Sequence, residues 1–142
     1  MTISASATAG PASPPGSAAR YRPGVCNIGP DEIARRRRAG HFGVIATIAV
    51  LAVLVAIDAP PVARLLTALP AAVAASGYLQ AWLRFCAGFA SRGVFNFGPL
   101  GRTEAVVDEE ARRRDRRRSR EIGLASLAVG LAVGVVAALL PI

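Results

Sequence analysis

Lysine is absent from this 142-residue chain, which has only one histidine and two cysteines. Two cysteines are too few for the several cross-links of a small disulfide-stabilised domain. The chain also lacks the GxxxxGK[ST], GxSxG and HExxH patterns, so the common signatures of phosphate-binding loops, serine hydrolases and zinc proteases are excluded. No secretory signal is expected, because no apolar run of about 7–15 residues follows a basic start.

Charged side chains are missing from three long stretches, Ala39–Ile57, Leu65–Leu83 and Ile122–Ile142, of 19, 19 and 21 residues. A helix of that length spans roughly 28 Å, close to the hydrocarbon thickness of a bilayer. Mean hydropathy is +0.43 although the net charge is +8. We therefore expect an all-α integral membrane protein with three transmembrane helices. The alternative is a soluble all-α bundle, whose buried helices would usually carry charges along one edge.

Ionisable residues are also absent from the middle of each stretch. Pumps and proton-coupled carriers usually keep such groups there, because they are costly in lipid and serve transport. Their absence argues against a self-sufficient transporter. We predict no catalytic residue and no cofactor.

The chain is expected to divide into six parts according to its composition. These are a disordered tail (1–20), a cytoplasmic juxtamembrane segment (21–41), transmembrane helix 1 (42–57), transmembrane helix 2 (62–85), a basic cytoplasmic loop and helix (86–121), and transmembrane helix 3 (122–140). The tail is predicted to be disordered because its Ser, Ala, Thr, Pro and Gly residues cannot bury enough surface to offset the entropy of ordering.

Local signals suggest where the helices begin and end. Pro30 with two following acids predicts a short amphipathic helix that ends at Arg35–Arg38. Pro70 is expected to kink the second transmembrane helix. Thr103 is expected to cap a helix that starts at Glu104 and continues through the arginines into the third span.

The arginines are distributed very unevenly around the three stretches. Six precede the first stretch, ten lie between the second and third, and only Arg64 lies on the other side. Since cytoplasmic loops carry an excess of positive charge, the N-terminus and the central loop should be cytoplasmic and the C-terminus outside. This arrangement predicts a protein of the cell inner (plasma) membrane.

Seven arginines cluster directly before the third stretch, with a single aspartate among them. Such a cluster beside a membrane span is typical of binding to anionic lipid headgroups, and it also suffices as a topology anchor. Nucleic-acid binding is not expected, because no recognition fold is indicated. The predicted lipid-binding residues are Arg112, Arg113, Arg114, Arg116, Arg117, Arg118 and Arg120.

Small residues recur every four positions in the third stretch, at Ser126, Gly130, Gly134 and Ala138. This spacing lines one helix face with small side chains and allows close backbone contact in lipid. Packing on the first two helices is the favoured use. The alternative is homodimerisation, in which this face contacts a second copy of the chain.

Both cysteines, Cys26 and Cys86, lie close to a predicted span on the cytoplasmic side, and His41 lies at a similar depth. Three ligands drawn from three segments would form a metal or redox site only if the chain brought them together. Arg22 and Arg84 would then lower the thiol pKa values. Reversible acylation and two inert free thiols are the other interpretations.

Four phenylalanines alternate with glycines between residues 85 and 101. This segment is either a docking platform for lipid or a partner, or a loop that keeps its rings out of water. Asn96, between two of these phenylalanines, is expected to cap a local turn.

The segments Cys-Asn-Ile-Gly-Pro-x-Glu-Ile (26–33), Arg-Phe-Cys (84–86) and Gly-Val-Phe-Asn-Phe (93–97) resemble a group of uncharacterised small prokaryotic membrane proteins. The similarity covers roughly residues 26–98 and brings no established activity with it. It implies one cytoplasmic-side constellation, made of Cys26, Asn27, Glu32, Arg84, Cys86 and Asn96.

Taken together, these features predict a structural or accessory membrane component that acts through a basic cytoplasmic face. The alternative function is a thiol-based metal-binding or redox site at the two cysteines.

Overall fold

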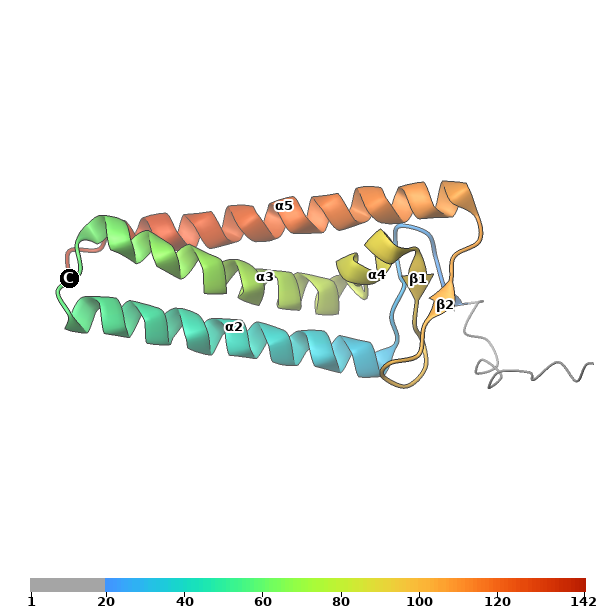
Figure 1. Ribbon diagram of the computed structural model, residues 1–142, viewed down its shortest axis with the longest axis horizontal. Coiled ribbons are helices and arrows are strands. Elements are labelled where there is room, and N and C mark those ends of the chain that lie inside the picture. Colours follow the sequence, from blue (N-terminus) through green and yellow to red (C-terminus); the bar gives the residue numbers. More distant parts are fainter. Residues whose placement is uncertain (1–19) are drawn as a thin grey trace, which may run out of the picture.

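The computed structural model describes residues 20–142 and contains three long helices that run side by side (Figure 1). These are α2 (Pro30–Ala56), α3 (Ala68–Leu83) and α5 (Glu109–Leu139). A 3₁₀ segment, η1 (Pro61–Thr67), leads directly into α3. The helices α2 and α5, and η1 together with α3, are each long and apolar enough to cross a membrane. The predicted disordered tail lies outside the described residues, apart from Arg20.

Helix α2 is one continuous helix of 27 residues, so the prediction of a short helix ending at Arg35–Arg38 was wrong. Its start is as expected, with Pro30 in the first turn followed by two acids. The helix continues because no residue between the arginines and the apolar stretch breaks it. Gly40 is accommodated there, buried against the ring of Tyr78.

Helix α5 begins at Glu109, and Asp108 rather than Thr103 is its N-cap. The Asp108 carboxylate accepts a hydrogen bond from the backbone N–H of Ala111 at 3.0 Å. Glu104, predicted as a helix start, instead lies in the strand β2 (Glu104–Ala105). Aspartate is at least as good an N-cap as threonine, and strand pairing holds the residues before it in an extended conformation.

Pro70 falls in the first turn of α3, where a missing backbone N–H costs little. We expected a kink at Pro70 within one helix. The structure instead has a change from the 3₁₀ geometry of η1 to the α-helical geometry of α3, two residues before Pro70. At its other end, α3 stops at Arg84, whose φ of 52° lies in the left-handed region.

Small residues lie where the three helices touch. A Cβ atom added to Gly43 of α2 would lie 2.5 Å from the backbone nitrogen of Ala74 in α3. One added to Gly130 of α5 would lie 2.6 Å from the carbonyl oxygen of Ala68. Close contact of this kind is how helices associate where burial of apolar side chains gives no driving force.

The small-residue face of α5 packs on the second arm of the hairpin, which consists of η1 and α3. Ser126, Gly130 and Gly134 are all buried there. The fourth buried position is Ala137, whereas Ala138 is only half-buried. Residues four apart move gradually around a helix of 3.6 residues per turn. A step of three, from Gly134 to Ala137, therefore brings the next small residue back to the packed face.

Large apolar side chains point outward from the bundle. Ile45 and Ile48 of α2 are each 63 % exposed, and Leu127 of α5 is also 63 % exposed. The interior is thus filled by small residues and the surface by large apolar ones, the reverse of a soluble helical bundle.

Arg64 lies in η1, next to the C-terminal residues that follow α5. Its side chain is buried and donates to the carbonyl oxygen of Leu140 at 2.9 Å and also to that of Ile142. Arg64 therefore ties the residues that directly follow α5 to η1.

We predict that Gly130→Ala lowers the free energy of unfolding by roughly 1–3 kcal/mol, because the added methyl group would push α5 away from α3. Gly123→Ala is the matched control on the same helix, since a Cβ atom there meets no atom within 4 Å. It should be neutral or stabilise the helix by up to about 1 kcal/mol. Unfolding by increasing SDS in a fixed mild detergent measures both. Equal effects of the two substitutions would contradict the close packing.

Candidate functional site

A small folded region closes one end of the helix bundle (Figure 1). We call it the head, and it comprises residues 21–29, residues 84–108, and the first turns of α2 and α5. Its elements are α4 (Ala87–Arg92) and the strands β1 (Val94–Phe95) and β2, which pair antiparallel. Of the residues singled out in the sequence, it contains the six that the resemblance groups together, namely Cys26, Asn27, Glu32, Arg84, Cys86 and Asn96.

The phenylalanines of the central segment form the core of the head. Phe85 is 0 % exposed, and Phe89 and Phe95 are each 5 % exposed. Phe89 packs with Ile28 and Cys86, while Phe95 belongs to a second cluster with Val106. The rings are kept out of water inside the head rather than presented as a docking platform.

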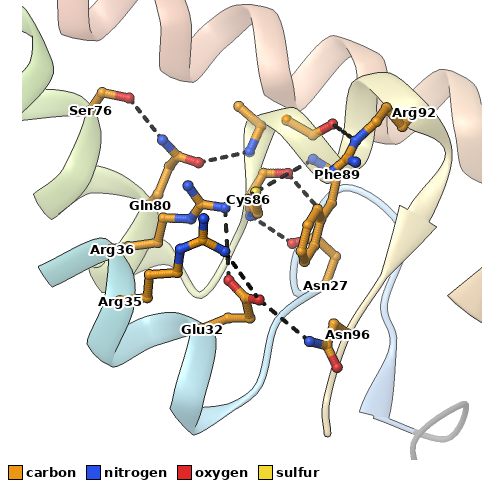
Figure 2. Close-up of polar contacts among 12 residues, drawn as sticks. Asn27, Glu32, Arg35, Arg36, Ser76, Gln80, Cys86, Phe89, Arg92 and Asn96 are labelled. Carbon is orange, nitrogen blue, oxygen red and sulfur yellow. Dashed lines mark hydrogen bonds and ion pairs between the residues drawn. The ribbon is translucent and has the colours of Figure 1, made fainter. Parts of the chain in front are cut away.

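Asn27 joins the N-terminal segment to the end of α3. Its Oδ1 accepts from the backbone N–H of Cys86 at 2.6 Å, and its Nδ2 donates to the carbonyl oxygen of Cys86 at 3.1 Å (Figure 2). The backbone N–H of Asn27 donates to the carbonyl of Arg84, and its own carbonyl accepts from the N–H of Asn96. A fully buried amide with both ends bonded to the backbone fixes the position of the whole segment.

Glu32 is a fully buried carboxylate in the first turn of α2. Its oxygens lie 3.9 Å from Arg35 and 3.8 Å from Arg36, and Asn96 Nδ2 donates to Oε1 at 3.4 Å (Figure 2). A helix N-terminus and two guanidinium groups offset the cost of burying this charge. Asn96 also forms the expected turn, because its Oδ1 accepts from the N–H of Gly98.

Cys86 is contacted by Arg36, which extends from α2 across the head. The distance from Arg36 Nη2 to Cys86 Sγ is 2.8 Å, and the N–H of Phe89 donates to the same sulfur at 3.4 Å (Figure 2). Arg84, the neighbour expected from the sequence, has an exposed side chain and contributes only its carbonyl. Arg36 could not be identified beforehand, because it lies 50 positions from Cys86 in the chain.

The other two predicted ligands lie elsewhere. Cys26 is half-buried, with Sγ 3.9 Å from the carbonyl oxygen of Ile28, and His41 is exposed and bonded to the hydroxyl of Tyr78. Within residues 20–142, no three His, Cys, Asp or Glu side chains are grouped so that they could hold a metal ion. Thus Cys26, Cys86 and His41 are not assembled into one site.

Asp115 forms a second buried acidic centre that sequence reasoning missed. It is 0 % exposed, although it lies among seven arginines on α5. Tyr21 donates its hydroxyl to Oδ2 at 2.6 Å, and the N–H of Gly24 donates to Oδ1 at 2.7 Å. Burial, followed by the hydrogen bond and the charge of Asp115, raises the pKa of Tyr21.

The arginines predicted to bind lipid headgroups are largely paired along α5. Arg114 lies 3.4 Å from Glu110, and Arg117 lies 3.4 Å from Glu121. Glu109 accepts a hydrogen bond from Arg116 at 2.9 Å, which lowers the pKa of this carboxyl. The remaining members are Arg112, bonded to the carbonyl of Val106, Arg113, near Glu109, Arg118, near Glu121, and the exposed Arg120.

No protein-family model, curated protein or solved structure matches this chain. The resemblance to small prokaryotic membrane proteins implied a constellation of six residues, and four of these are closely connected in space. Asn27, Cys86, Glu32 and Asn96 are linked through shared hydrogen bonds and through Arg36, whereas the side chains of Cys26 and Arg84 lie outside this network.

We predict that Tyr21→Phe lowers the free energy of unfolding by roughly 1–2 kcal/mol at pH 7, because Asp115 loses a donor. The raised pKa of Tyr21 adds stability that is fully present below about pH 10 and is lost as the pH rises above it. The difference between wild type and variant should therefore shrink at alkaline pH. SDS unfolding at several pH values measures this.

Tyr78→Phe is the matched control for that experiment, since it removes the other tyrosine hydroxyl of the chain from an exposed contact with His41. It should change the free energy of unfolding by less than about 0.5 kcal/mol. A Tyr21→Phe variant as stable as wild type at neutral pH would show that Asp115 does not need this donor.

Proposed function

We propose that this protein is a small multi-pass component of the cell inner (plasma) membrane, with its N-terminus in the cytoplasm and its C-terminus outside. The observation that carries the proposal is the separation of charge from apolar surface. Sixteen of the seventeen arginines lie in residues 20–38 and 84–120, which form the head or adjoin it, whereas Arg64 alone lies beside the C-terminus at the opposite end. Positive charge on one flank of an apolar bundle favours a cytoplasmic head.

Within this proposal the protein has a structural or accessory role and works through the basic face of α5. Arg113 and Arg117 support it, because their side chains are 69 % and 83 % exposed on the outside of the head. Their neighbouring glutamates reduce the net charge but leave seven arginines against four acids between residues 109 and 121. Candidate partners are anionic lipid headgroups and another membrane protein with an acidic surface.

A thiol-dependent function is the second candidate. It is favoured by one observation, the 2.8 Å contact between Arg36 Nη2 and Cys86 Sγ, which places a cationic side chain directly beside a thiol. Against it, Cys86 is 1 % exposed, so an external reactant would have to enter the head.

The proposed location predicts that the expressed protein stays in the membrane pellet after ultracentrifugation and is released by detergent but not by high salt. A reporter fused behind Ile142 should be active only outside the cytoplasm, and one fused before Tyr21 only inside it. The reason is that three spans place the two ends on opposite sides. Recovery in the supernatant, or a cytosolic reporter behind Ile142, would contradict the proposal.

The double substitution Cys26→Ser and Cys86→Ser separates the two candidate functions. For an accessory component, membrane insertion and the complexes recovered in mild detergent should be unchanged, because serine can accept the hydrogen bonds made by Cys86. For a thiol-based site, the metal content of the purified protein, or the complexes that depend on the thiols, would fall to background. Mass spectrometry identifies the bound proteins, and metal analysis of the same samples measures the metal content.

A further inference from the structure

An open groove runs along the side of the molecule where the head meets the bundle. Its volume is about 1190 Å³, and it lies between residues 20–30, the start of α2 and the end of α3. Small-molecule sites typically measure roughly 300–1,000 Å³, so this groove has room for a ligand larger than a simple metabolite.

Positive charge dominates the polar lining of the groove. Arg20, Arg22, Arg37 and Arg84 all line it, and no Asp or Glu of the described chain does. All four arginines are exposed, and the structure gives none of their side chains an ion pair with a carboxylate in residues 20–142. This distinguishes them from most arginines of α5, whose charge is partly offset by glutamates one turn away.

The rest of the lining is apolar and continues onto the outer surface of α3. Trp82 is 80 % exposed beside Arg84, and Leu83, Val25 and Ile33 extend the apolar wall. Tyr78, one turn before Trp82, also lines the groove. Tryptophan and tyrosine are enriched where the apolar core of a bilayer meets its headgroups.

We propose that this groove binds one anionic glycerophospholipid from the membrane that surrounds the bundle. The phosphate lies among Arg22, Arg37 and Arg84, and the upper acyl chains lie along α3 across Trp82. This inference rests on the proposed membrane location, and it goes beyond the proposed function by assigning a defined lipid site away from α5.

The combination of surfaces decides between a lipid and other anions. A small soluble anion would satisfy the arginines but leave Trp82 and the apolar wall uncovered. An uncharged lipid would cover that wall but leave four positive charges without a counterion. Only an amphiphile with a negative headgroup matches both parts, by charge complementarity and by burial of apolar surface.

Trp82 is the only tryptophan in the chain and therefore reports directly on the groove. The full chain is reconstituted in dioleoyl phosphatidylcholine vesicles that contain increasing fractions of phosphatidylglycerol with brominated acyl chains, which quench tryptophan fluorescence on contact. Brominated phosphatidylcholine is the neutral reference. We expect quenching to saturate at a lower fraction of the anionic lipid, and inorganic phosphate at equal concentration not to reverse it.

The variant Arg37→Gln/Arg84→Gln should reduce the preference for phosphatidylglycerol about 25-fold, at about fivefold for each charge near the surface. Both side chains are exposed and make no hydrogen bond within residues 20–142, so the fold should be retained, which circular dichroism checks. Arg37→Lys/Arg84→Lys keeps the charge and should keep most of the preference. The matched control, Arg38→Gln/Arg102→Gln, removes two exposed charges that lie outside both the groove and α5, and it should change the preference less than twofold.

Cys26 provides an independent readout because its half-buried thiol also lines the groove, whereas Cys86 is buried. Its reaction with a maleimide should slow at least threefold when phosphatidylglycerol replaces phosphatidylcholine, and Arg37→Gln/Arg84→Gln should remove this protection. Cys26→Ser identifies the labelled residue.

Three outcomes would overturn the groove proposal. They are equal quenching by anionic and neutral lipid, reversal of quenching by inorganic phosphate, and an equal loss of preference in the Arg38→Gln/Arg102→Gln control. All three outcomes leave the proposed basic face of α5 untouched, whereas loss of the protein from the membrane pellet would remove both proposals.

Discussion

Close contact between α3 and its two neighbours is the constraint on which the remaining structure depends. Gly43 of α2 meets Ala74 of α3 on one side, and Gly130 of α5 meets Ala68 on the other. With nothing larger between them, the three helices stay side by side along their length (Figure 1). This packing holds three elements at one end of the bundle, namely the start of α2, the end of α3 and the basic first turns of α5. The head forms at that end.

Bringing these ends together also brings charged side chains into the interior. Glu32 and Asp115 are both fully buried, and each would be costly without partners. Glu32 is supported from its own helix by Arg36, whereas Asp115 is supported by Tyr21 and the backbone of Gly24. The segment 21–29 is therefore part of the structural core of the head, even though its sequence has the Pro and Gly content of a loop.

Much of the bundle could be predicted from sequence because it depends on local properties. Uncharged stretches reveal the three long apolar helical segments, and a four-residue spacing identifies the packed face at Ser126, Gly130 and Gly134. The N-cap at Asp108 was missed because Thr103 offered a competing local signal five residues earlier. The exchange of Ala138 for Ala137 follows from the drift of that spacing on a helix.

The interior of the head could not be derived in the same way, because its contacts join residues far apart in the chain. The pairs Tyr21–Asp115 and Arg36–Cys86 are separated by 94 and 50 positions. No periodicity or spacing connects such residues. The motif segments containing Asn27 and Asn96 did indicate a shared location, but not that Asn27 bonds to the backbone of Cys86.

Helical spacing also determines which arginines of the head remain available to a ligand. On α5, Arg113 and Arg114 follow Glu109 and Glu110 by four residues, so each finds a carboxylate one turn away. On α2, the corresponding positions before Arg37 hold Ile33 and Ala34, which offer no counter-charge.

Arg84 ends α3 in a left-handed conformation, with no acidic residue within four positions on either side. Two chains of similar arginine content could thus differ completely in the positive charge they present. In this chain the register of α2 and the end of α3 concentrate the unneutralised charge beside Trp82, where the head meets the apolar surface of the bundle.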